Sequence, residues 1–283
     1  MSLAYFNGEF MPLTEVRVSA LDRGFLFGDG VYEAIPFYKN KGFGEAEHLA
    51  RLAKSLQALE IATPLSITAW QTIFQRLLAS QTEENNIIYL QITRGVMTER
   101  LHIYPPANTE PTVFAFVKAF TPGRLSDGIN AITLEDIRWR DCYIKSLNLL
   151  PNCMASELAH RHNANEAILY QDNQVTEGSS SNIFMVKDNH VCTTSLSPNI
   201  LSGISRIMTL KILKNQKIPY SEKTITLAEL QTADEIWITS STREIAPVLK
   251  LDNKVIGTGC PGPIWQKVYQ EYVAQTQAKG IDK

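Results

Sequence analysis

The sequence contains few of the features that mark metal-binding or disulfide-rich proteins. Its four cysteines are widely spaced, at Cys142, Cys153, Cys192 and Cys260. No two of them form a C-x-x-C pair, which argues against a zinc site and against a small disulfide scaffold. His160 and His162 do not form a metal site either, because residues two apart lie about 200° apart around a helix. We therefore expect buried free thiols and no bound metal.

An excess of charge and a long apolar run are also missing. The chain has 27 Lys and Arg against 29 Asp and Glu, which gives a formal net charge of −2. This balance gives little electrostatic support for a nucleic-acid or anionic-membrane partner. No window approaches the roughly 20 apolar residues of a membrane span, and the first residues do not resemble a secretory signal. We expect a cytoplasmic protein whose partners are small molecules.

The first part of the chain combines strand and helix patterns. With 283 residues and 44% hydrophobic content, the chain is long enough for one large domain or two smaller ones. Asn7-Gly8 predicts a hairpin turn, and residues 31–38, 86–93 and 112–118 are typical of strands. Apolar residues at helical spacing predict two amphipathic helices, one over residues 45–61 and one that begins near Trp70.

The strongest break in the chain follows these elements. Thr121-Pro122-Gly123-Arg124 and Asp127-Gly128 predict a linker over residues 121–128. Beyond it we expect strands at residues 131–135, 167–170, 183–186 and 235–239, and helices near 149–162 and 204–216. The sequence shows no internal repeat. It therefore predicts two mixed α/β domains, 1–120 and 129–283, with the functional site between them.

Two segments suggest a cofactor site. Thr176-Glu177-Gly178-Ser179-Ser180-Ser181-Asn182 places an acid beside Gly and Ser, and Glu177 follows Lys145 by 32 positions. A lysine that forms an imine with an aldehyde, together with an acid that keeps a pyridine nitrogen protonated, is the pair that pyridoxal phosphate chemistry needs. Each residue also has an ordinary alternative, because Lys145 could be a solvated surface group and Glu177 could cap a turn.

Further polar segments are ambiguous when each is taken alone. Leu201-Ser202-Gly203-Ile204-Ser205-Arg206 opens an amphipathic helix, whose free amides would bind a phosphate, but it could equally be an ordinary helix cap. Thr239-Ser240-Ser241-Thr242 ends an expected strand with clustered hydroxyls, a common loop composition. Arg51 could be a surface residue of the first helix.

The order of these segments resembles the fold type IV pyridoxal phosphate enzymes over nearly the whole chain. This group contains D-amino-acid aminotransferase, branched-chain aminotransferase and aminodeoxychorismate lyase. The segments that match, in sequence order, also include Asp22-Arg23-Gly24, the segment from Phe27 to Glu33, and His48-Leu49-Ala50-Arg51-Leu52. The resemblance implies the mixed α/β architecture of that group, two domains with pyridoxal 5′-phosphate between them.

The resemblance also implies roles for individual residues. Lys145 would be the Schiff-base lysine and Glu177 the partner of the pyridine nitrogen. The other implied cofactor ligands are Arg51, Ser181, Ile204, Ser205 and Ser241. The implied substrate-binding residues are Tyr32, Arg100, His102, Arg138, Ser180 and Thr242.

Within the group, the segment 144–150 and Arg100-Leu101-His102 are most similar to D-amino-acid aminotransferase. Arg100 and His102, which alone could be a solvated loop pair, would bind the substrate carboxylate together with Tyr32. The position of that carboxylate decides which enantiomer presents its Cα–H to Lys145. The resemblance implies a ping-pong transamination, in which D-alanine and 2-oxoglutarate give pyruvate and D-glutamate, in a homodimer whose Arg100 loop reaches the neighbouring site.

Two alternatives within the group and two departures from its pattern stay open. Aminodeoxychorismate lyase and branched-chain aminotransferase share the fold, the lysine and the cofactor. The loop before Arg100 is about one residue longer than the resemblance leads us to expect, and Arg243 adds a charge directly after the hydroxyl cluster. Arg243 could extend phosphate or carboxylate binding, or it could be a surface residue.

Overall fold

The computed structural model describes residues 2–277 and divides the chain into two units. The first unit comprises Met1–Thr121 and Ile144–Asn148, and the second comprises Pro122–Tyr143 and Leu149–Lys283. Lys145 therefore belongs to the first unit, which differs from the expected division. The reason is local pairing, since Ser146 forms an antiparallel bridge with Val31 and the Tyr32 amide donates to the Lys145 carbonyl at 3.0 Å.

The first unit is an antiparallel sheet with two long helices. Its strand order is β2-β1-β6-β5-β3-β4. The strands are β1 (Leu3–Phe6), β2 (Glu9–Pro12), β3 (Gly30–Tyr38), β4 (Lys41–Gly42), β5 (Asn86–Thr93) and β6 (Thr112–Ala119). The helices are η1 (Leu13–Glu15), α1 (Arg23–Phe27), α2 (Glu45–Ala58) and α3 (Ile67–Leu78). The predicted hairpin, strands and two amphipathic helices of this unit are confirmed.

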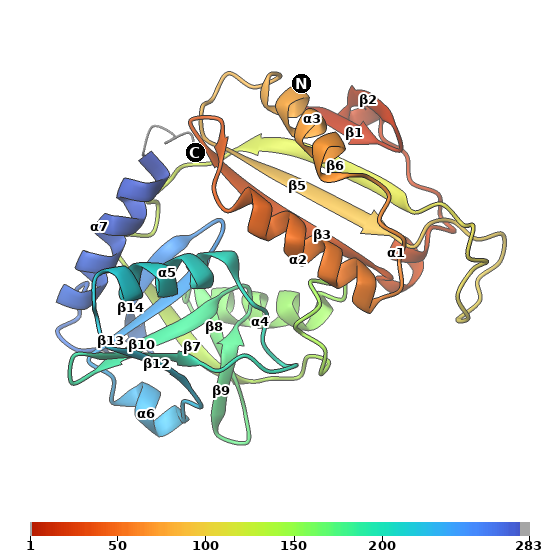
Figure 1. Cartoon of the computed structure of the whole chain (residues 1–283). Helices are drawn as coiled ribbons and strands as arrows, with labels where there is room; N and C mark the ends of the chain where they lie inside the picture. The colour runs from red at the N-terminus through yellow and green to blue at the C-terminus, as the bar shows by residue number, and fades with distance from the viewer. Residues whose placement is uncertain (1, 278–283) are drawn as a thin grey trace. The chain divides into compact units, whose positions relative to one another are not determined.

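Alternation along the strands decides which side of this sheet is covered. Val31 and Ile35 of β3 share one core with Leu52 of α2 and Phe74 of α3, so both helices cover the same face (Figure 1). Side chains of intervening positions, such as Tyr32, point to the other face, because neighbouring residues of a strand alternate sides. Glu33 points to the same side of the sheet as Val31 and Ile35 and therefore lies under α2. This position allows it to contact a residue of the candidate site.

The second unit is a mixed sheet with four helices. Its strand order is β12-β11-β10-β13-β14-β7-β8-β9, and β15 pairs with β14. Its strands are β7 (Ile129–Glu135), β8 (Glu166–Gln171), β9 (Gln174–Gly178), β10 (Asn182–Lys187), β11 (His190–Thr194), β12 (Tyr220–Lys223), β13 (Glu235–Ser240), β14 (Glu244–Leu251) and β15 (Lys254–Val255). Its helices are α4 (Leu150–Arg161), α5 (Ile204–Asn215), α6 (Leu227–Gln231) and α7 (Pro263–Gln277). The expected α/β class is confirmed.

The helices of the second unit pack on different strands. α4 contacts β7 and β8, whereas α5 contacts β13 and α7 (Figure 1). Under α5, the rings of Phe184 and Trp237 stack with centroids 5.5 Å apart. One expectation needs correction here, because Glu177 lies inside strand β9 and the Gly/Ser turn begins only after Gly178.

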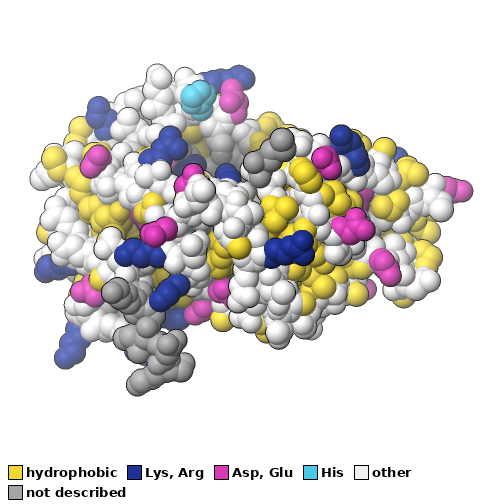
Figure 2. Space-filling model, turned by 90° about the horizontal axis from the view of Figure 1, so that it is seen from above, with side chains coloured by type: hydrophobic (Ala, Val, Ile, Leu, Met, Phe, Trp, Pro, Cys, Tyr) yellow, Lys and Arg dark blue, Asp and Glu magenta, His cyan; other side chains and the backbone are white. Residues whose placement is uncertain are grey.

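The surface shows the charge balance of the sequence. On the face drawn in Figure 2, basic and acidic side chains are interspersed rather than collected by sign. Over residues 2–277, none of the helices has both the length and the apolar character needed to cross a membrane.

Candidate functional site

Lys145 lies beside Tyr32 in the first unit. The segment Ile144–Asn148 runs along the start of β3, where the Leu147 amide donates to the Gly30 carbonyl at 3.0 Å. Lys145 Nζ is 4.1 Å from the centroid of the Tyr32 ring, within the range of a cation–π contact. The structure therefore brings together two of the residues that the sequence marked, one for the cofactor and one for the substrate.

Arg51 is oriented by a buried carboxylate that the sequence did not reveal. Its Nε and Nη2 donate to the two oxygens of Glu33 at 2.8 and 2.7 Å, a bidentate arrangement. His48 Nδ1 lies 2.7 Å from the same carboxylate. Glu33 is fully buried on the core side of β3. Its hydrogen bonds therefore fix the position of the Arg51 guanidinium on the side of α2 that faces the sheet.

The ionisation states of this network follow from its geometry. Burial opposes the charge on Glu33, but Arg51 and His48 lower its pKa well below the usual range, so it stays ionised. Burial lowers the pKa of His48, with Glu33 acting in the opposite direction, so the imidazole is neutral near pH 7. An ionised carboxylate only accepts hydrogen bonds, so Nδ1 of His48 carries the proton that it donates.

Arg100 and His102 lie together in the exposed loop between β5 and β6. The Arg100 guanidinium is 4.8 Å from the centroid of the Phe27 ring, and the His102 ring packs edge-on against the same ring at 5.4 Å. Phe27 ends the short helix α1, which Asp22 caps by accepting from the Gly24 amide at 2.8 Å. Phe27 thus packs against the loop that contains Arg100 and His102. This contact gives a physical reason for the match of residues 22–33 to the fold type IV pattern.

Arg23 fastens the backbone of the same loop. Its side chain is buried, and Nη1 donates to the carbonyls of Leu101 and Ile103 at 2.7 and 3.1 Å. Its Nε donates to Asp29 at 2.7 Å, and Arg94 Nε donates to the same Asp29 oxygen at 2.8 Å. A buried arginine therefore sets the path of the backbone on both sides of His102.

Glu177 in the second unit is surrounded by hydrogen-bond donors. Arg138 Nη1 donates to Oε1 at 2.5 Å, while Asn182 Nδ2 and the Leu201 amide donate to Oε2 at 3.0 and 3.1 Å. Arg138 is itself fixed by a bidentate pair with Asp136 at 2.9 and 2.7 Å. A carboxylate has about four acceptor positions, so Glu177 retains capacity for one further donor.

Burial and charge act in opposite directions on this pair. Burial raises the pKa of Glu177 to about 7, and the Arg138 guanidinium works against that rise. Burial alone would lower the pKa of Arg138, but its bonds to Asp136 and Glu177 raise it above the usual value, so it stays charged. An acid that titrates near neutral pH inside a protein is a sign of a functional position.

The start of α5 offers an anion site. Gly203 is the N-cap residue and gives no side-chain cap, while Ile204 and Ser205 of the first turn are buried. A Cβ at Gly203 would come within 2.0 Å of Asn182 Oδ1, so only glycine fits there. The first amides of a helix have no partner inside the helix and favour an anion such as a phosphate. The Ser205 hydroxyl lies 3.4 Å from that of Tyr272.

Two turns of the second unit contain the remaining predicted residues. Ser180 is exposed at the tip of the turn between β9 and β10, and Ser181 is buried and donates to Glu166 at 2.7 Å. Ser241 and Thr242 lie in the three-residue loop between β13 and β14. The predicted residues thus divide between the two units.

The chain matches one known family over most of its length. The amino-transferase class IV family matches residues 30–251, a range that spans Tyr32, Lys145, Glu177 and the α5 start. The chain belongs to the class IV aminotransferases. The fold type IV resemblance expected from the sequence is confirmed.

Relatives of this class IV aminotransferase are similar over the full length. A D-alanine aminotransferase of Staphylococcus aureus (strain MSSA476) is 38% identical over 283 residues, which cover 99% of this chain and 100% of that protein. A D-alanine aminotransferase of Bacillus licheniformis is 40% identical over 264 residues, 93% of each protein.

Solved structures show the fold of the class IV aminotransferases. The branched-chain amino acid aminotransferase of Escherichia coli superimposes with a TM-score of 0.90 at 24% identity, covering 100% of this chain and 96% of that one. The T.th. branched-chain amino acid aminotransferase complexed with N-(5′-phosphopyridoxyl)-L-glutamate superimposes with a TM-score of 0.89 at 24% identity, with 97% of this chain and 93% of that one covered.

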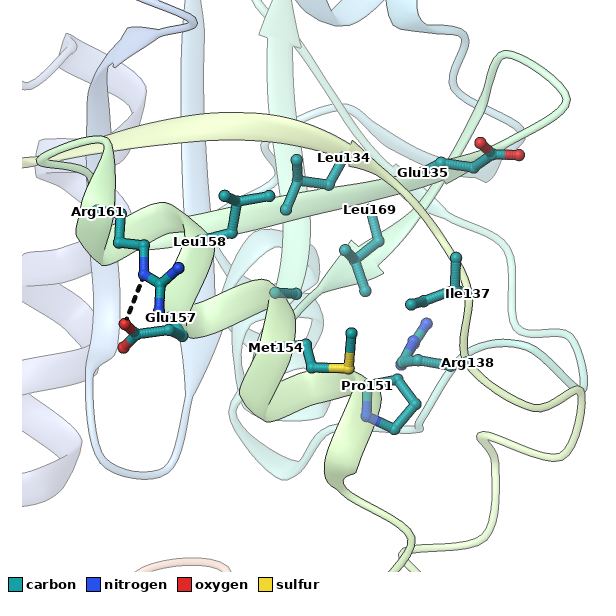
Figure 3. Close-up of a pocket in the computed structure, with 11 residues that line it drawn as sticks. Leu134, Glu135, Ile137, Arg138, Pro151, Met154, Glu157, Leu158, Arg161 and Leu169 are labelled. Carbon is teal, nitrogen blue, oxygen red and sulfur yellow. Dashed lines mark hydrogen bonds and ion pairs between the residues drawn. The ribbon is translucent and has the colours of Figure 1, made fainter.

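A cavity of about 400 Å³ in the second unit contributes little to the predicted site. Leu134, Leu158 and Met154 line it together with other apolar side chains from α4, β7 and β8 (Figure 3). Arg138 borders it, but the guanidinium is already bonded to Asp136 and Glu177. The lining of this cavity is mainly apolar, whereas polar side chains gather around Glu177.

Proposed function

We propose that the chain is a D-amino-acid transaminase that exchanges the amino group of D-alanine with 2-oxoglutarate, with pyridoxal 5′-phosphate as cofactor. The full-length identity of 37–40% to proteins named D-alanine aminotransferase carries this proposal. Arg100 and His102 support it, because a guanidinium and an imidazole on one loop suit the α-carboxylate of an amino acid.

Each unit holds residues that fit a part of the proposed cofactor. When bound, pyridoxal phosphate supplies an aldehyde that reacts with amines and a ring that accepts electrons. The uncapped start of α5 offers amides to the phosphate, with Arg51 as a cation, and Glu177 retains an acceptor position for the ring nitrogen. We propose that the residues that hold the cofactor are Lys145 and Arg51 in the first unit, and Glu177, Ser241 and the α5 amides in the second.

The side chains of the site have separate tasks in the reaction. Lys145 Nζ, as the free amine, would take the proton from Cα of the amino acid and pass it to the bound cofactor, and the second half-reaction would run this transfer in reverse. The Tyr32 ring lies beside Lys145 Nζ and orients it, and Glu177, in its ionised form, would face the ring nitrogen. Ser180 and Thr242 offer hydroxyls at the two exposed turns for the bound substrate. The two halves alternate, which makes the kinetics ping-pong.

We propose that the enzyme is a homodimer in which the Arg100 loop binds substrate in the neighbouring subunit. Around this loop, Phe25, Ile103 and Tyr104 are exposed by 73%, 70% and 55%. On the open face of the first unit's sheet, the partly buried rings of Tyr89 and Phe116 lie 5.3 Å apart. Apolar groups collected in this way are typical of a protein–protein contact. A cytoplasmic location stays a prediction.

The substrate proposal is tested by mixing purified enzyme, D-alanine and 2-oxoglutarate and measuring pyruvate with a coupled dehydrogenase. We expect pyruvate from D-alanine and none from L-alanine, because the carboxylate position decides which enantiomer presents its Cα–H to Lys145. Transamination of L-leucine would instead support a branched-chain aminotransferase. Release of pyruvate from aminodeoxychorismate alone would support the lyase.

Two inactive variants test whether the loop acts across the dimer. Arg100→Leu removes the carboxylate ligand, and Lys145→Ala removes the proton-transfer group. If the loop reaches the neighbouring site, a mixed dimer has one site with both residues, so an equal mixture regains about a quarter of the wild-type activity. We expect this recovery after the two proteins are mixed and allowed to exchange subunits.

Recovery should be absent if each loop serves its own subunit, because every site then lacks one of the two residues. A mixture of Arg100→Leu with Arg17→Leu provides the control, since Arg17 is exposed and donates to carbonyls of its own turn. Arg17→Leu alone should be fully active. An inactive Arg100→Leu and Lys145→Ala mixture, with exchange shown by differently tagged chains, would refute the shared site.

A further inference from the structure

Glu166 connects the turn after Glu177 to the rest of the second unit. It begins β8 and is completely buried. Oε1 accepts from the Ala167 amide at 2.9 Å, from the Ser179 amide at 3.1 Å and from the Ser179 hydroxyl, while Oε2 accepts from the Ser181 hydroxyl at 2.7 Å. The residues on both sides of Ser180 are therefore bonded to one carboxylate.

Arg243 connects a second turn to the same carboxylate. β13 and β14 are joined by Ser241, Thr242 and Arg243, with Ser240 paired to Glu244. Arg243 Nη1 donates to Glu166 Oε2 at 2.9 Å and to the Asn165 carbonyl at 3.2 Å. The Arg243 amide lies 3.2 Å from the Ser240 hydroxyl, which closes the loop from the other side. Thr242 is thus next to a residue anchored on Glu166.

The anion that pairs with the Arg243 guanidinium is Glu166, a residue of the protein itself. Its side chain is 25% exposed, whereas that of Glu166 is 0% exposed. A buried carboxylate requires a compensating charge, and removal of one partner of such a pair is costly because the other charge stays buried. This geometry favours a structural use of Arg243 over the binding of a phosphate or a substrate carboxylate.

We infer that Glu166 and Arg243 are positioning residues that fix the Ser179–Ser181 and Ser241–Arg243 turns toward the cofactor and the substrate. One carboxylate joins the two turns, and this ion pair adds a link between them to the pairing of β10 with β13. The inference rests on the proposed function, because it assumes that Ser180, Ser241 and Thr242 serve the bound cofactor and substrate.

Release of pyridoxal phosphate from the holoenzyme tests this inference. Near-visible absorbance is followed during dialysis of wild type, Arg243→Gln and Arg243→Lys. We expect Arg243→Gln to release the cofactor about tenfold faster, because Glu166 then loses its cation and the two turns separate. Arg243→Lys should restore most of the wild-type rate, because an ammonium can also pair with Glu166. Lys187→Gln, which removes a surface pair with Asp234, should release the cofactor at the wild-type rate.

The double variant Glu166→Gln with Arg243→Gln separates positioning from direct anion binding. If the two residues act through each other, the double variant should release the cofactor no faster than the faster single variant, which is a non-additive result. A wild-type rate for Arg243→Gln would overturn the inference. So would a double variant whose effect is the product of both single effects. Should Glu166→Gln fail to fold, the comparison of Gln and Lys at position 243 decides alone.

These outcomes are distinct from failure of the proposed function. A purified chain without near-visible absorbance, even after incubation with pyridoxal phosphate, would refute the proposed cofactor and this inference together. A chain that binds pyridoxal phosphate but does not use D-alanine would refute only the proposed substrate. The release measurement contains no amino acid, so it would still decide the role of Arg243.

Discussion

Lys145→Ala is expected to abolish transamination and the near-visible absorbance of the bound cofactor together. In the proposed function the lysine provides both the covalent attachment and the group that moves the Cα proton, and its amine lies beside the Tyr32 ring. Loss of one proton-transfer group typically costs a factor of about 10² to 10⁴, and loss of the attachment adds to this. Activity is measured by pyruvate release and binding by absorbance of the same samples.

Lys54→Ala is the matched control for this variant. Lys54 is an exposed lysine of α2, in the same unit as Lys145, and its removal should leave both signals unchanged. Circular dichroism of Lys145→Ala separates a loss of activity at the site from a loss of the fold. A Lys145→Ala protein that is folded by circular dichroism but colourless and inactive agrees with the assignment. Retained turnover would remove Lys145 from the mechanism.

Glu177→Gln is expected to lower the turnover number by about a hundredfold or more, on the order of 3 kcal/mol in the barrier. The amide can still accept a hydrogen bond, but it cannot balance a positive ring nitrogen, so the ring becomes a weaker electron acceptor. The substitution also turns an amide NH₂ toward one of the three donors around the carboxylate, Arg138, Asn182 or the Leu201 amide. Both effects lower the turnover number of Glu177→Gln.

The pKa of Glu177 adds a pH dependence to this prediction. Because burial raises that pKa to about 7, the carboxylate ionises as pH rises through 7, and only the ionised form stabilises a protonated ring nitrogen. Cofactor affinity of the cofactor-free wild type should therefore increase with pH in this window, and the increase should be absent in Glu177→Gln. Fluorescence titration with pyridoxal phosphate at several pH values measures both.

Glu229→Gln is the control for the carboxylate substitution. Glu229 is 40% exposed, pairs with Lys223 at the surface and caps α6, which a glutamine can also do. Its variant should retain the wild-type rate and pH dependence. Equal rates for wild type and Glu177→Gln would show that the ring nitrogen does not need a negative partner.

Local signals in the sequence predicted most of the regular structure. The Asn7-Gly8 turn has positive φ at both residues and connects neighbouring strands as expected, and Asp172-Asn173 has the same geometry between β8 and β9. The amphipathic helices also agree to within a few residues. β14 was not predicted, because Pro247 and a nearly continuous apolar run hide the alternation of a strand, and β9 was not predicted because Gly178 and the serines suggested a turn.

Residues that act through long-range contacts were harder to predict. Glu33 was part of a matched segment, but its role depends on the alternation that places it under α2, beside Arg51. Arg23 was also part of a matched segment, but its contact with the Leu101 carbonyl spans 78 positions, and the Arg243 partner of Glu166 is 77 positions away in sequence. The Lys145 segment was assigned to the later domain because sequence order does not show that it pairs with Val31.

Asn182 fixes the spacing between Glu177 and the start of α5, the two parts of the proposed cofactor site in the second unit. Its amide nitrogen donates to Glu177 and to the Leu201 carbonyl, and its oxygen occupies the space that a side chain at position 203 would fill. One side chain thus spans from the acid to the first turn of α5. A shift of the helix start would displace Asn182, so one side chain keeps the acid and the anion-binding end of α5 at a constant spacing.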